Sequence, residues 1–484
     1  MLETHKMDTA LWWIRRDLRL GDNQALAAAL DQAGTVIPVF VYDSKRLMAP
    51  PAPGYKPLAF LAEGLRRLDA DLRARGSRLI FRAGESATQL ACLLAETGAG
   101  AIWAEEEIAP AQREHDAKLA ETLPLCLAGG LTIHPPDAVR RAGGRPYAVY
   151  SPYRRAWQAL PATGLVLAAP ARLPVPPTVA SRPILDELTL PAGVPFRPGE
   201  TEAHHRLQAF SEGSSPAIFR YAELRDRLDL DVTSQLSPYL RHGMISARQA
   251  AAGASAAAEA APDDAARQGV DAWLAELIWR EFFVSVLYHW PDVTKQSFNP
   301  RLRQVSWHAD QEGFDAWCRG RTGYPVVDAA MRQLAHTGWL PNRARMIAAS
   351  FLVKDLMIDW RWGERWFMEQ LIDGDQAANN GGWQWVAGTG TDATPYFRVF
   401  NPVTQGRRHD PAGTYVRRWL PELARVPDTY VHAPWQMPAE MQQAAGCVVG
   451  RDYPAPIVDH ALARDRALAA YSHAWQAGNG RSGP

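Results

Sequence analysis

Residues 8–135 alternate short apolar runs typical of β-strands with segments of helical spacing, and few folds accommodate that order. The apolar runs lie at 11–14, 36–42, 78–81, 101–104 and 131–133, and the helical segments near 24–33, 57–75, 87–97 and 110–123. Such alternation predicts a parallel sheet flanked by helices. We therefore expect a five-stranded, Rossmann-like α/β domain. Since no GxGxxG follows the first run, a nicotinamide dinucleotide site is disfavoured.

The composition changes after this region. Between Pro135 and Pro198 stand thirteen of the 37 prolines, which exclude a long helix or a central strand, and we interpret residues 136–203 as an extended linker. Residues 204–475 carry amphipathic helical patterns interrupted by Ser-Pro and Trp-Pro breaks. The sequence thus predicts an all-helical second domain that is larger than the first.

Charge and cysteine content limit the possible classes of protein. The 52 basic residues balance 52 acidic ones, so any nucleic-acid binding must rest on a localised basic surface. The four cysteines lack CxxC spacing, which argues against a disulfide framework or a zinc site, and we expect core thiols in a reducing cytoplasm. No apolar run approaches the ~18–20 residues of a membrane helix. We expect a cytoplasmic protein that binds neither a metal nor a membrane.

The segment Asp373–Trp385, DGDQAANNGGWQW, combines acids, amides, paired glycines and tryptophans without hydrophobic periodicity. It follows an apolar helical pattern from Met346 to Trp366, so we expect it to leave a helix end and turn against a flat, polar, buried group. A bound cofactor is the natural candidate.

Together with TGTDATPYFRVFNP at 389–402 and WWIRRDLRLGDN at 12–23, this segment resembles the signatures of the DNA photolyase and cryptochrome flavoproteins. The similarity is closest to the class I cyclobutane pyrimidine dimer photolyases. It implies one non-covalent FAD, active as the reduced anion, and an antenna chromophore of the methenyltetrahydrofolate or 8-hydroxy-deazaflavin type. Because Ala109 precedes Pro110 where the family usually has an acid, no antenna residues are carried over.

The resemblance also implies a flavin site. Ser237 and Pro238 look like an N-cap followed by the first helical residue, an arrangement that suits a phosphate. By the resemblance, Asp373 pairs with Arg345 beside the ring, and Asn379 faces flavin N5, as in repair enzymes. The complete set of implied flavin residues is Tyr221, Thr233, Ser234, Gln235, Leu236, Ser237, Trp273, Arg345, Asp373, Gly374, Asp375 and Asn379.

The resemblance implies a lesion pocket as well. Glu276 would hydrogen-bond the damaged bases, Trp279 and Trp385 would form aromatic walls, and Asn342 and Met346 would point into the cavity. From pattern alone, Glu276 and Arg280 could equally form an i,i+4 ion pair, and Met346 could be a core residue. The predicted phosphate contacts are Arg225, Arg280, Arg343 and Arg398, and the predicted electron-transfer chain is Trp307, Trp360 and Trp383.

These features predict an enzyme that splits cyclobutane pyrimidine dimers in UV-damaged DNA with light. We expect a monomer that associates with the bacterial nucleoid when it is bound to DNA. The alternatives are a cryptochrome-type blue-light receptor and a six-four photolyase; a flavin dehydrogenase would need a nicotinamide site, which the sequence lacks. Asn379 and Met346 favour the repair enzyme.

Overall fold

The computed structural model describes residues 6–47, 53–161, 166–173 and 178–479. The chain forms two compact units that each combine distant segments. The first unit contains Met1–Ala222, Thr233–Pro291 and Ile372–Ala377, and the second contains Glu223–Val232, Asp292–Leu371 and Ala378–Pro484. Each unit is described by itself below.

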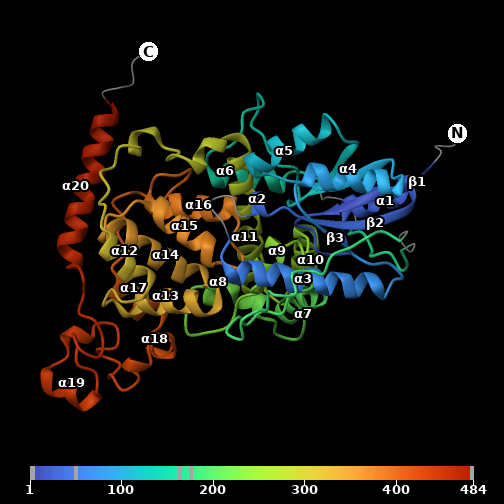
Figure 1. Ribbon diagram of the computed structural model, residues 1–484. Coiled ribbons are helices and arrows are strands. Elements are labelled where there is room, and N and C mark those ends of the chain that lie inside the picture. The colour runs from blue at the N-terminus through green and yellow to red at the C-terminus, as the bar shows by residue number, and fades with distance from the viewer. Residues whose placement is uncertain (1–5, 48–52, 162–165, 174–177, 480–484) are drawn as a thin grey trace. The chain divides into compact units, whose positions relative to one another are not determined.

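A five-stranded parallel sheet lies in the first unit (Figure 1). Its strands are β1 (Met7–Ile14), β2 (Ala33–Tyr42), β3 (Ile80–Ala83), β4 (Ala101–Glu106) and β5 (Leu125–Gly130). Their order is β3-β2-β1-β4-β5, and every neighbouring pair is parallel. In the central strand, Leu11 pairs with Ile37 on one side and Ile102 on the other, and all three are fully buried. The Rossmann-like α/β prediction is confirmed.

The predicted position of the fifth strand is wrong, because β5 ends at Gly130 and residues 131–133 lie in a bend. Two side chains of a later helix form hydrogen bonds with the backbone of this bend. The Ile133 N–H donates to the carboxylate of Glu281, and Arg280 Nη1 donates to the Leu131 carbonyl at 2.6 Å. An apolar triplet alone does not reveal such a long-range competitor.

The predicted helices of the α/β region are confirmed. They are α1 (Gln24–Gln32), α3 (Tyr55–Arg73), α4 (Ser86–Thr97) and α5 (Pro110–Ala120), with the short α2 (Ser44–Leu47) in addition. Asn23 caps α1 by accepting a hydrogen bond from the Leu26 N–H, and Gly98 ends α4 in the left-handed conformation. The proline-rich segment also contains a helix that the sequence did not predict, α6 (Tyr150–Gln158).

The remaining elements are helical in both units. They are α7 (Glu200–Ser211), η1 (Ala217–Arg220), α8 (Tyr221–Leu224), α9 (Ser237–Arg241), α10 (Ala247–Ala260), α11 (Asp264–His289), η2 (Pro291–Thr294), η3 (Pro300–Leu302), α12 (Gln311–Cys318), α13 (Pro325–Thr337), α14 (Asn342–Ser350), η4 (Phe351–Asp355), α15 (Trp360–Gln370), α16 (Gln376–Ala387), α17 (Pro402–His409), α18 (Thr414–Trp419), η5 (Pro421–Leu423), η6 (Pro434–Gln436), α19 (Ala439–Ala445) and α20 (His460–Asn479). The prediction of a helical second half is confirmed.

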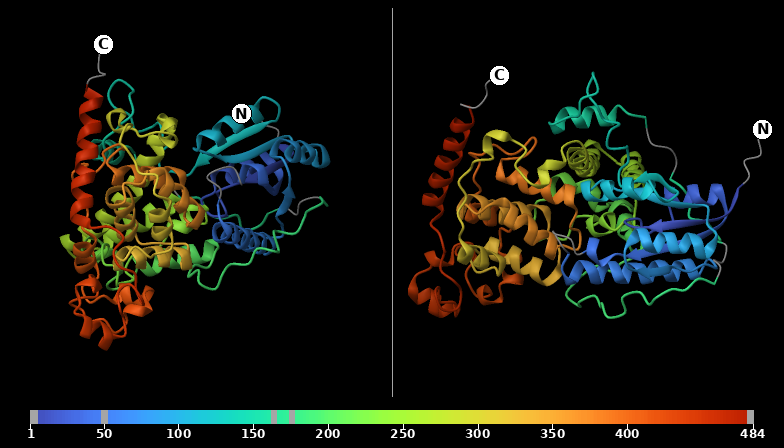
Figure 2. Two further views of the ribbon diagram at one scale, coloured as in Figure 1. Left: turned by 60° about the vertical axis from the view of Figure 1, so that its left-hand side comes forward. Right: turned by 45° about the horizontal axis from the view of Figure 1, so that its top comes forward.

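The apolar pattern from Met346 to Trp366 does not form one helix. After α14 the chain makes a π-helical turn, η4, and Met357 adopts a φ of 55° before α15 starts. Asp359 caps α15 by accepting from the Arg361 N–H at 3.0 Å. Hydrophobic periodicity continues across the break because both sides face one core. Figure 2 shows the C-terminal α20, whose Tyr471 and Ala467 pack with Met357 in a smaller cluster.

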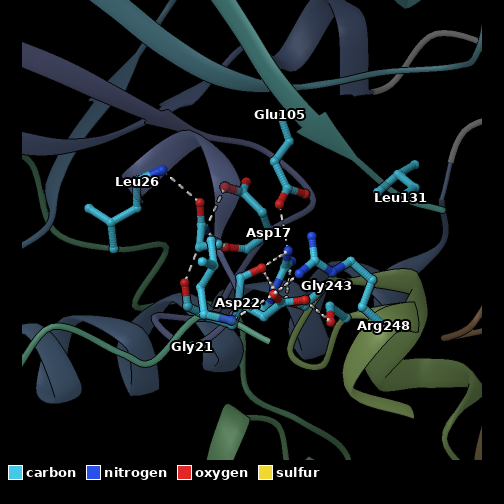
Figure 3. A network of polar contacts seen from close by, with 12 residues as sticks. Asp17, Gly21, Asp22, Leu26, Glu105, Leu131, Gly243 and Arg248 are labelled. Carbon is cyan, nitrogen blue, oxygen red and sulfur yellow. Dashed lines mark hydrogen bonds and ion pairs between the residues drawn. The ribbon is translucent and has the colours of Figure 1, made fainter. Parts of the chain in front are cut away.

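The segment after β1 is the centre of a buried polar network in the first unit (Figure 3). Asp22 accepts from Ser246 Oγ at 2.6 Å and pairs with Arg248 at 3.3 Å. Asp17 accepts from Trp12 Nε1 and Asn23 Nδ2. The WWIRRDLRLGDN signature therefore has a structural role, since it ties the end of β1 to the start of α10.

Two of the four free cysteines, Cys318 and Cys447, are buried as expected, whereas Cys92 is exposed on α4 and Cys126 is half-buried. The core-thiol prediction is therefore wrong for Cys92. Within residues 6–47, 53–161, 166–173 and 178–479, no helix has the length and hydropathy needed to span a membrane. The same described residues contain no cluster of three acidic, histidine or cysteine side chains that could hold a metal.

Candidate functional site

Three side chains that the sequence did not indicate as functional contact the turn Ile372–Asp375 and fix its position. Arg16, just beyond β1, pairs with Asp375 at 2.6 Å, and Arg241 Nε donates to the Gly374 carbonyl. His242 Nε2 lies 3.0 Å from the Ile372 carbonyl. Burial and the neighbouring Arg241 lower the pKa of His242 to about 3, so it is neutral. The predicted turn at Asp373 is present, but the following residues form α16 and do not continue the turn.

The predicted phosphate-binding segment, residues 233–237, lies beside Trp273 in the first unit. Trp273 Nε1 donates to Ser234 Oγ at 3.2 Å, and its ring lies 5.5 Å from Phe210, which also contacts Tyr221 at 6.0 Å. Gln235 adopts a φ of 50°, which turns the chain sharply before α9. The structure thus brings Tyr221, Ser234 and Trp273 together.

The predicted N-cap of α9 is displaced by one residue. Leu236 is the capping residue and makes no side-chain capping bond, whereas Ser237 is the first helical residue and is exposed. Helix limits shift easily by one residue when a Ser-Pro pair opens the first turn. The Ser237 hydroxyl therefore does not close the helix end in the way the Ser-Pro pattern predicted.

Helix α11 carries Trp273, Glu276, Trp279 and Arg280. Trp273 is buried, while Glu276 and Trp279 are half-buried. Arg280 Nη1 donates to the Leu131 carbonyl at 2.6 Å, and burial lowers the pKa of its guanidinium. Arg280 therefore has a structural partner inside its own unit, which accounts for its position without the alternative i,i+4 pair with Glu276, and its predicted phosphate contact stays a prediction.

In the second unit, a buried hydrogen-bond network sets the orientation of Asn379. Its Nδ2 donates to the Glu364 carbonyl at 3.0 Å. A carbonyl oxygen can only accept, so the amide nitrogen must face Glu364 and the amide oxygen must point away from it. The adjacent Asn380 donates to the Glu364 carboxylate at 2.9 Å and to the Val293 carbonyl at 3.0 Å.

The Glu364 carboxyl is a buried titratable group next to this network. Burial raises its pKa to about 7, against the hydrogen bond from Asn380 and the nearby Arg365 and Arg361, which favour the charged form. Nothing in the local pattern WRWGERW distinguishes this glutamate from a solvated one. Only the fold shows that Glu364 lies on the face of α15 that contacts α16.

Asn342, Met346 and Arg345 all lie on α14. Asn342 is exposed and Met346 is half-buried against the core of the second unit, as is Trp385 on α16. Arg345 Nε donates to the Leu340 carbonyl at 2.9 Å. These side chains are placed within their own unit, at the boundary between the core and the surface.

Three of the predicted phosphate-contacting arginines belong to the second unit. Arg343 pairs with Asp226. Arg225 is half-buried and lies next to that carboxylate in sequence. Arg398 is exposed, with its guanidinium 6.0 Å from the Phe400 ring. Arg398 therefore has the most accessible cation of the three.

The three tryptophans of the predicted electron-transfer chain belong to one hydrophobic cluster in the second unit. Trp360 is 1% and Trp383 3% exposed, whereas Trp307 is half-buried and packs on the outside of that cluster. A parallel bridge between His308 and Ile358 places the Trp307 segment beside the start of α15. Trp307 is therefore the most exposed of the three rings.

Two family models match this chain. The model described as DNA photolyase matches residues 10–177, and the FAD binding domain of DNA photolyase matches residues 273–473. The chain is 38% identical over 474 residues to a deoxyribodipyrimidine photo-lyase from Agrobacterium fabrum, which covers 95% of this chain and 97% of the relative.

Solved structures of photolyases and of a cryptochrome from Synechocystis sp. PCC6803 are similar to this chain, the cryptochrome with a TM-score of 0.86 at 29% identity, covering 96% of this chain and 99% of that chain. A bacterial class III photolyase from Agrobacterium tumefaciens is similar with a TM-score of 0.90 at 36% identity, covering 98% of this chain and 99% of that chain. An archaeal photolyase from Sulfolobus tokodaii, solved with two FAD molecules, is similar with a TM-score of 0.81 at 30% identity, covering 96% and 100%.

The fold and the two family models together define a flavoprotein that has an α/β domain and a helical FAD-binding domain. The chain belongs to the DNA photolyase family. It is a photo-lyase that binds FAD and serves light-driven DNA repair.

Proposed function

We propose that this enzyme splits cyclobutane pyrimidine dimers in UV-damaged DNA after extruding the dimer from the helix. The proposal rests above all on α11, which carries both the buried Trp273 beside Ser234 and the half-buried Glu276 and Trp279. The separation of six residues between Trp273 and Trp279 corresponds to about 9 Å along the helix axis. One rigid element thus spans from the flavin segment to the lesion contacts.

FAD, when bound as the reduced anion, would supply the light-driven one-electron chemistry that splits the dimer without net redox change. The residues present fit this group. The segment 233–237 and the turn Ile372–Asp375 offer hydroxyl and backbone groups to the polar part of the cofactor. The Asn379 amide oxygen, directed away from Glu364, is an acceptor suited to a flavin N5–H, and the neutral amide adds no negative charge beside an anion.

Recognition of the dimer follows from the chemistry of an extruded base. Photolyases are among the enzymes that flip their target out of the stack, at a cost of a few kcal/mol that is lower for damaged bases. Stacking on an aromatic side chain returns about 1–3 kcal/mol per base. Trp279 and Trp385 would supply these surfaces, with Asn342 and Met346 completing the pocket. Together they offset the cost of extrusion.

Glu276 would hydrogen-bond the dimer carbonyls. A carboxyl donates only while it holds a proton, so the protonated form would be the productive one. Preorganised polar groups of this kind stabilise charge that develops during a reaction. In this proposal residues 8–135 form the antenna domain, 136–203 the linker and 204–475 the catalytic domain. Excitation would be aided by a second chromophore, of the folate or deazaflavin type, in the antenna domain.

The decisive test uses oligonucleotides that carry one defined lesion. Purified enzyme with reduced FAD is mixed with a thymine cyclobutane dimer, a six-four photoproduct or undamaged DNA, in blue light and in darkness. We expect the enzyme to split the cyclobutane dimer in blue light and to leave it intact in darkness. Repair of the six-four product would transfer the assignment to that class, and failure to repair either lesion with FAD bound would favour a blue-light receptor.

A further inference from the structure

Trp279 does not stand alone on α11, because Tyr150 of α6 stacks on it. The two ring centroids lie 3.7 Å apart and the planes differ by only 9°. The other aromatic neighbours of Trp279 are not parallel to it: Phe282 meets it at 78° and Phe283 at 36°, both more than 5 Å away. Tyr150 is thus the one described aromatic residue that lies flat against a face of the indole.

Tyr150 is itself held firmly. Its side chain is 7% exposed, and its hydroxyl donates to the Ala275 carbonyl at 2.8 Å. In an α-helix this carbonyl also accepts the N–H of the residue four positions later, which is Trp279. The phenol ring is therefore fixed at one end by its attachment to α6 and at the other by the hydrogen bond of its hydroxyl to the peptide group that also accepts the Trp279 N–H.

The rest of α6 is anchored to the same helix. Trp157 Nε1 donates to the Glu281 carboxylate at 2.6 Å, and Tyr153 packs against Phe282 with centroids 5.2 Å apart. Helix α6 belongs to the proline-rich segment, which the sequence predicted to be an extended linker. The contacts give this part of the segment a position set by α11.

An indole has two faces, and Tyr150 occupies one of them. A base that stacks on Trp279 must therefore use the opposite face. Holding a side chain in its bound orientation before the ligand arrives removes the entropy cost of fixing it during binding. Leucine or methionine could fill the volume of Tyr150 but could not hold the indole plane in this way.

We propose that Tyr150 is a positioning residue for lesion recognition, which backs Trp279 so that its free face is presented to the extruded pyrimidine dimer. This inference rests on the proposed function, since it assumes that Trp279 contacts the lesion. Tyr150 itself does not touch the substrate. Its effect is expected in discrimination between damaged and undamaged DNA, and not in FAD binding.

The test measures, in darkness, the Kd of the FAD-loaded enzyme for an oligonucleotide with one cyclobutane dimer and for the same oligonucleotide undamaged. Tyr150→Leu should weaken binding of damaged DNA by about three- to tenfold, as expected for loss of one aromatic stack. Binding of undamaged DNA and the FAD absorbance should stay as in the wild type. Tyr150→Phe keeps the stack and should keep the affinity.

The matched control is Tyr153→Leu, which removes a buried aromatic ring from the same helix without touching Trp279. It should lower the thermal stability but leave the preference for damaged DNA unchanged. If Tyr150→Leu does not retain FAD, Tyr150→Met replaces it, since methionine fills irregular space without a planar ring.

Two results would overturn the inference. Binding by Tyr150→Leu within about twofold of the wild type would show that the stack does not matter. Tighter binding would show that Tyr150 covers the face that the lesion needs. Trp279→Ala, measured in parallel, distinguishes a failure of the proposed lesion contact from a failure of the positioning role of Tyr150. If it leaves the preference for damaged DNA intact, the proposed lesion contact itself is wrong; if it removes the preference and Tyr150→Leu does not, the positioning role alone is wrong.

Discussion

At the scale of single residues, α15 shows how two neighbours serve different parts of the site. Gly363 lies under the Trp383 ring, and a Cβ at this position would overlap the ring atoms Cη2 and Cζ3. The next residue, Glu364, accepts from Asn380 and, through its backbone carbonyl, orients Asn379. The small residue is needed for close packing of the predicted relay, whereas the backbone carbonyl of Glu364 orients the amide beside the predicted flavin position and its carboxylate holds the adjacent Asn380.

Replacing Trp383 tests the relay. Trp383→Phe should strongly slow the photoreduction of oxidised FAD, because phenylalanine is much harder to oxidise than an indole. Repair by enzyme reduced chemically beforehand should continue. The large-to-small change in the core should also cost about 1–2 kcal/mol of stability. Photoreduction is followed by the flavin absorbance under steady illumination.

The control for this prediction is Trp317→Phe. Trp317 is fully buried in the same cluster, with its ring 6.1 Å from Trp383, but it is not a predicted relay residue. It should lose similar stability and keep photoreduction. Photoreduction at the wild-type rate in Trp383→Phe would remove Trp383 from the path.

Glu364 predicts a dependence of stability on pH. Burial raises its pKa to about 7 in the folded protein, above the ~4.3 of an unfolded glutamate. The folded state therefore binds the proton more tightly than the unfolded state does. The resulting contribution to folding stability is fully present below pH ~4.3 and is lost as the pH rises through about 7. The loss amounts to at most about 4 kcal/mol.

Glu364→Gln keeps an oxygen acceptor for Asn380 and removes the titration. The thermal midpoint of the holoenzyme should fall less between about pH 5.5 and about pH 8 in this variant than in the wild type. Glu369→Gln, on the exposed side of the same helix, should behave like the wild type. An equal fall in wild type and Glu364→Gln would mean that Glu364 is not the titrating group.

At the scale of secondary-structure elements, the turn Ile372–Asp375 depends on groups far away in the chain. Arg16 lies more than 350 residues before Asp375. The sequence predicted a turn at this point correctly, because acids and glycine after an apolar helix favour one. It did not predict Arg16, Arg241 or His242 as supports, because no local spacing relates them to the turn.

Arg16→Ala should loosen this turn and weaken FAD retention by about ten- to hundredfold, since the largely buried Asp375 would lose the short ion pair with Arg16. Arg16→Lys should restore part of the retention. The dissociation of FAD is measured by the fluorescence of released flavin after dilution.

Arg67→Ala is the matched control, because Arg67 is an exposed arginine in a helical ion pair with Glu63 and should contribute little. FAD retention in Arg16→Ala equal to that of Arg67→Ala would show that the turn holds its conformation without the Arg16 contact.

At the scale of the whole molecule, the balanced charge has a consequence for DNA binding. With 52 basic and 52 acidic residues, the enzyme has no bulk attraction for DNA, so affinity must come from a few local phosphate contacts. Arg343 is already paired with Asp226, whereas Arg398 is exposed. Among the predicted phosphate contacts, Arg398 is therefore the most sensitive one to test.

Arg398→Ala should lower DNA affinity and reduce the slope of log K against log salt concentration by about one unit, the value for one lost phosphate contact. The effect should be the same for damaged and undamaged DNA, because phosphates carry no lesion information. Affinities are measured by titration over a range of salt concentrations.

Arg319→Ala removes another exposed arginine, 72% accessible and weakly paired with Asp315 at 3.8 Å, and should leave the slope unchanged. A slope in Arg398→Ala identical to that of Arg319→Ala would exclude a phosphate contact at Arg398.

The amino-acid order alone was sufficient for the α/β region, the helical second half, the turn at Asp373 and membership of the flavoprotein family. The periodicity of strands and helices and the residues of a motif are local properties of the sequence. They can be recognised without knowing which distant residues pack against them. The position of the fifth strand and helix α6 were not predictable in this way, because Glu281, Arg280 and Tyr150 act across more than a hundred residues. The segment after α14 likewise has distant partners, since His460 and Arg466 contact Asp355 across more than a hundred residues. Contacts of that range exist only after folding, so the supports of the site became visible only in three dimensions.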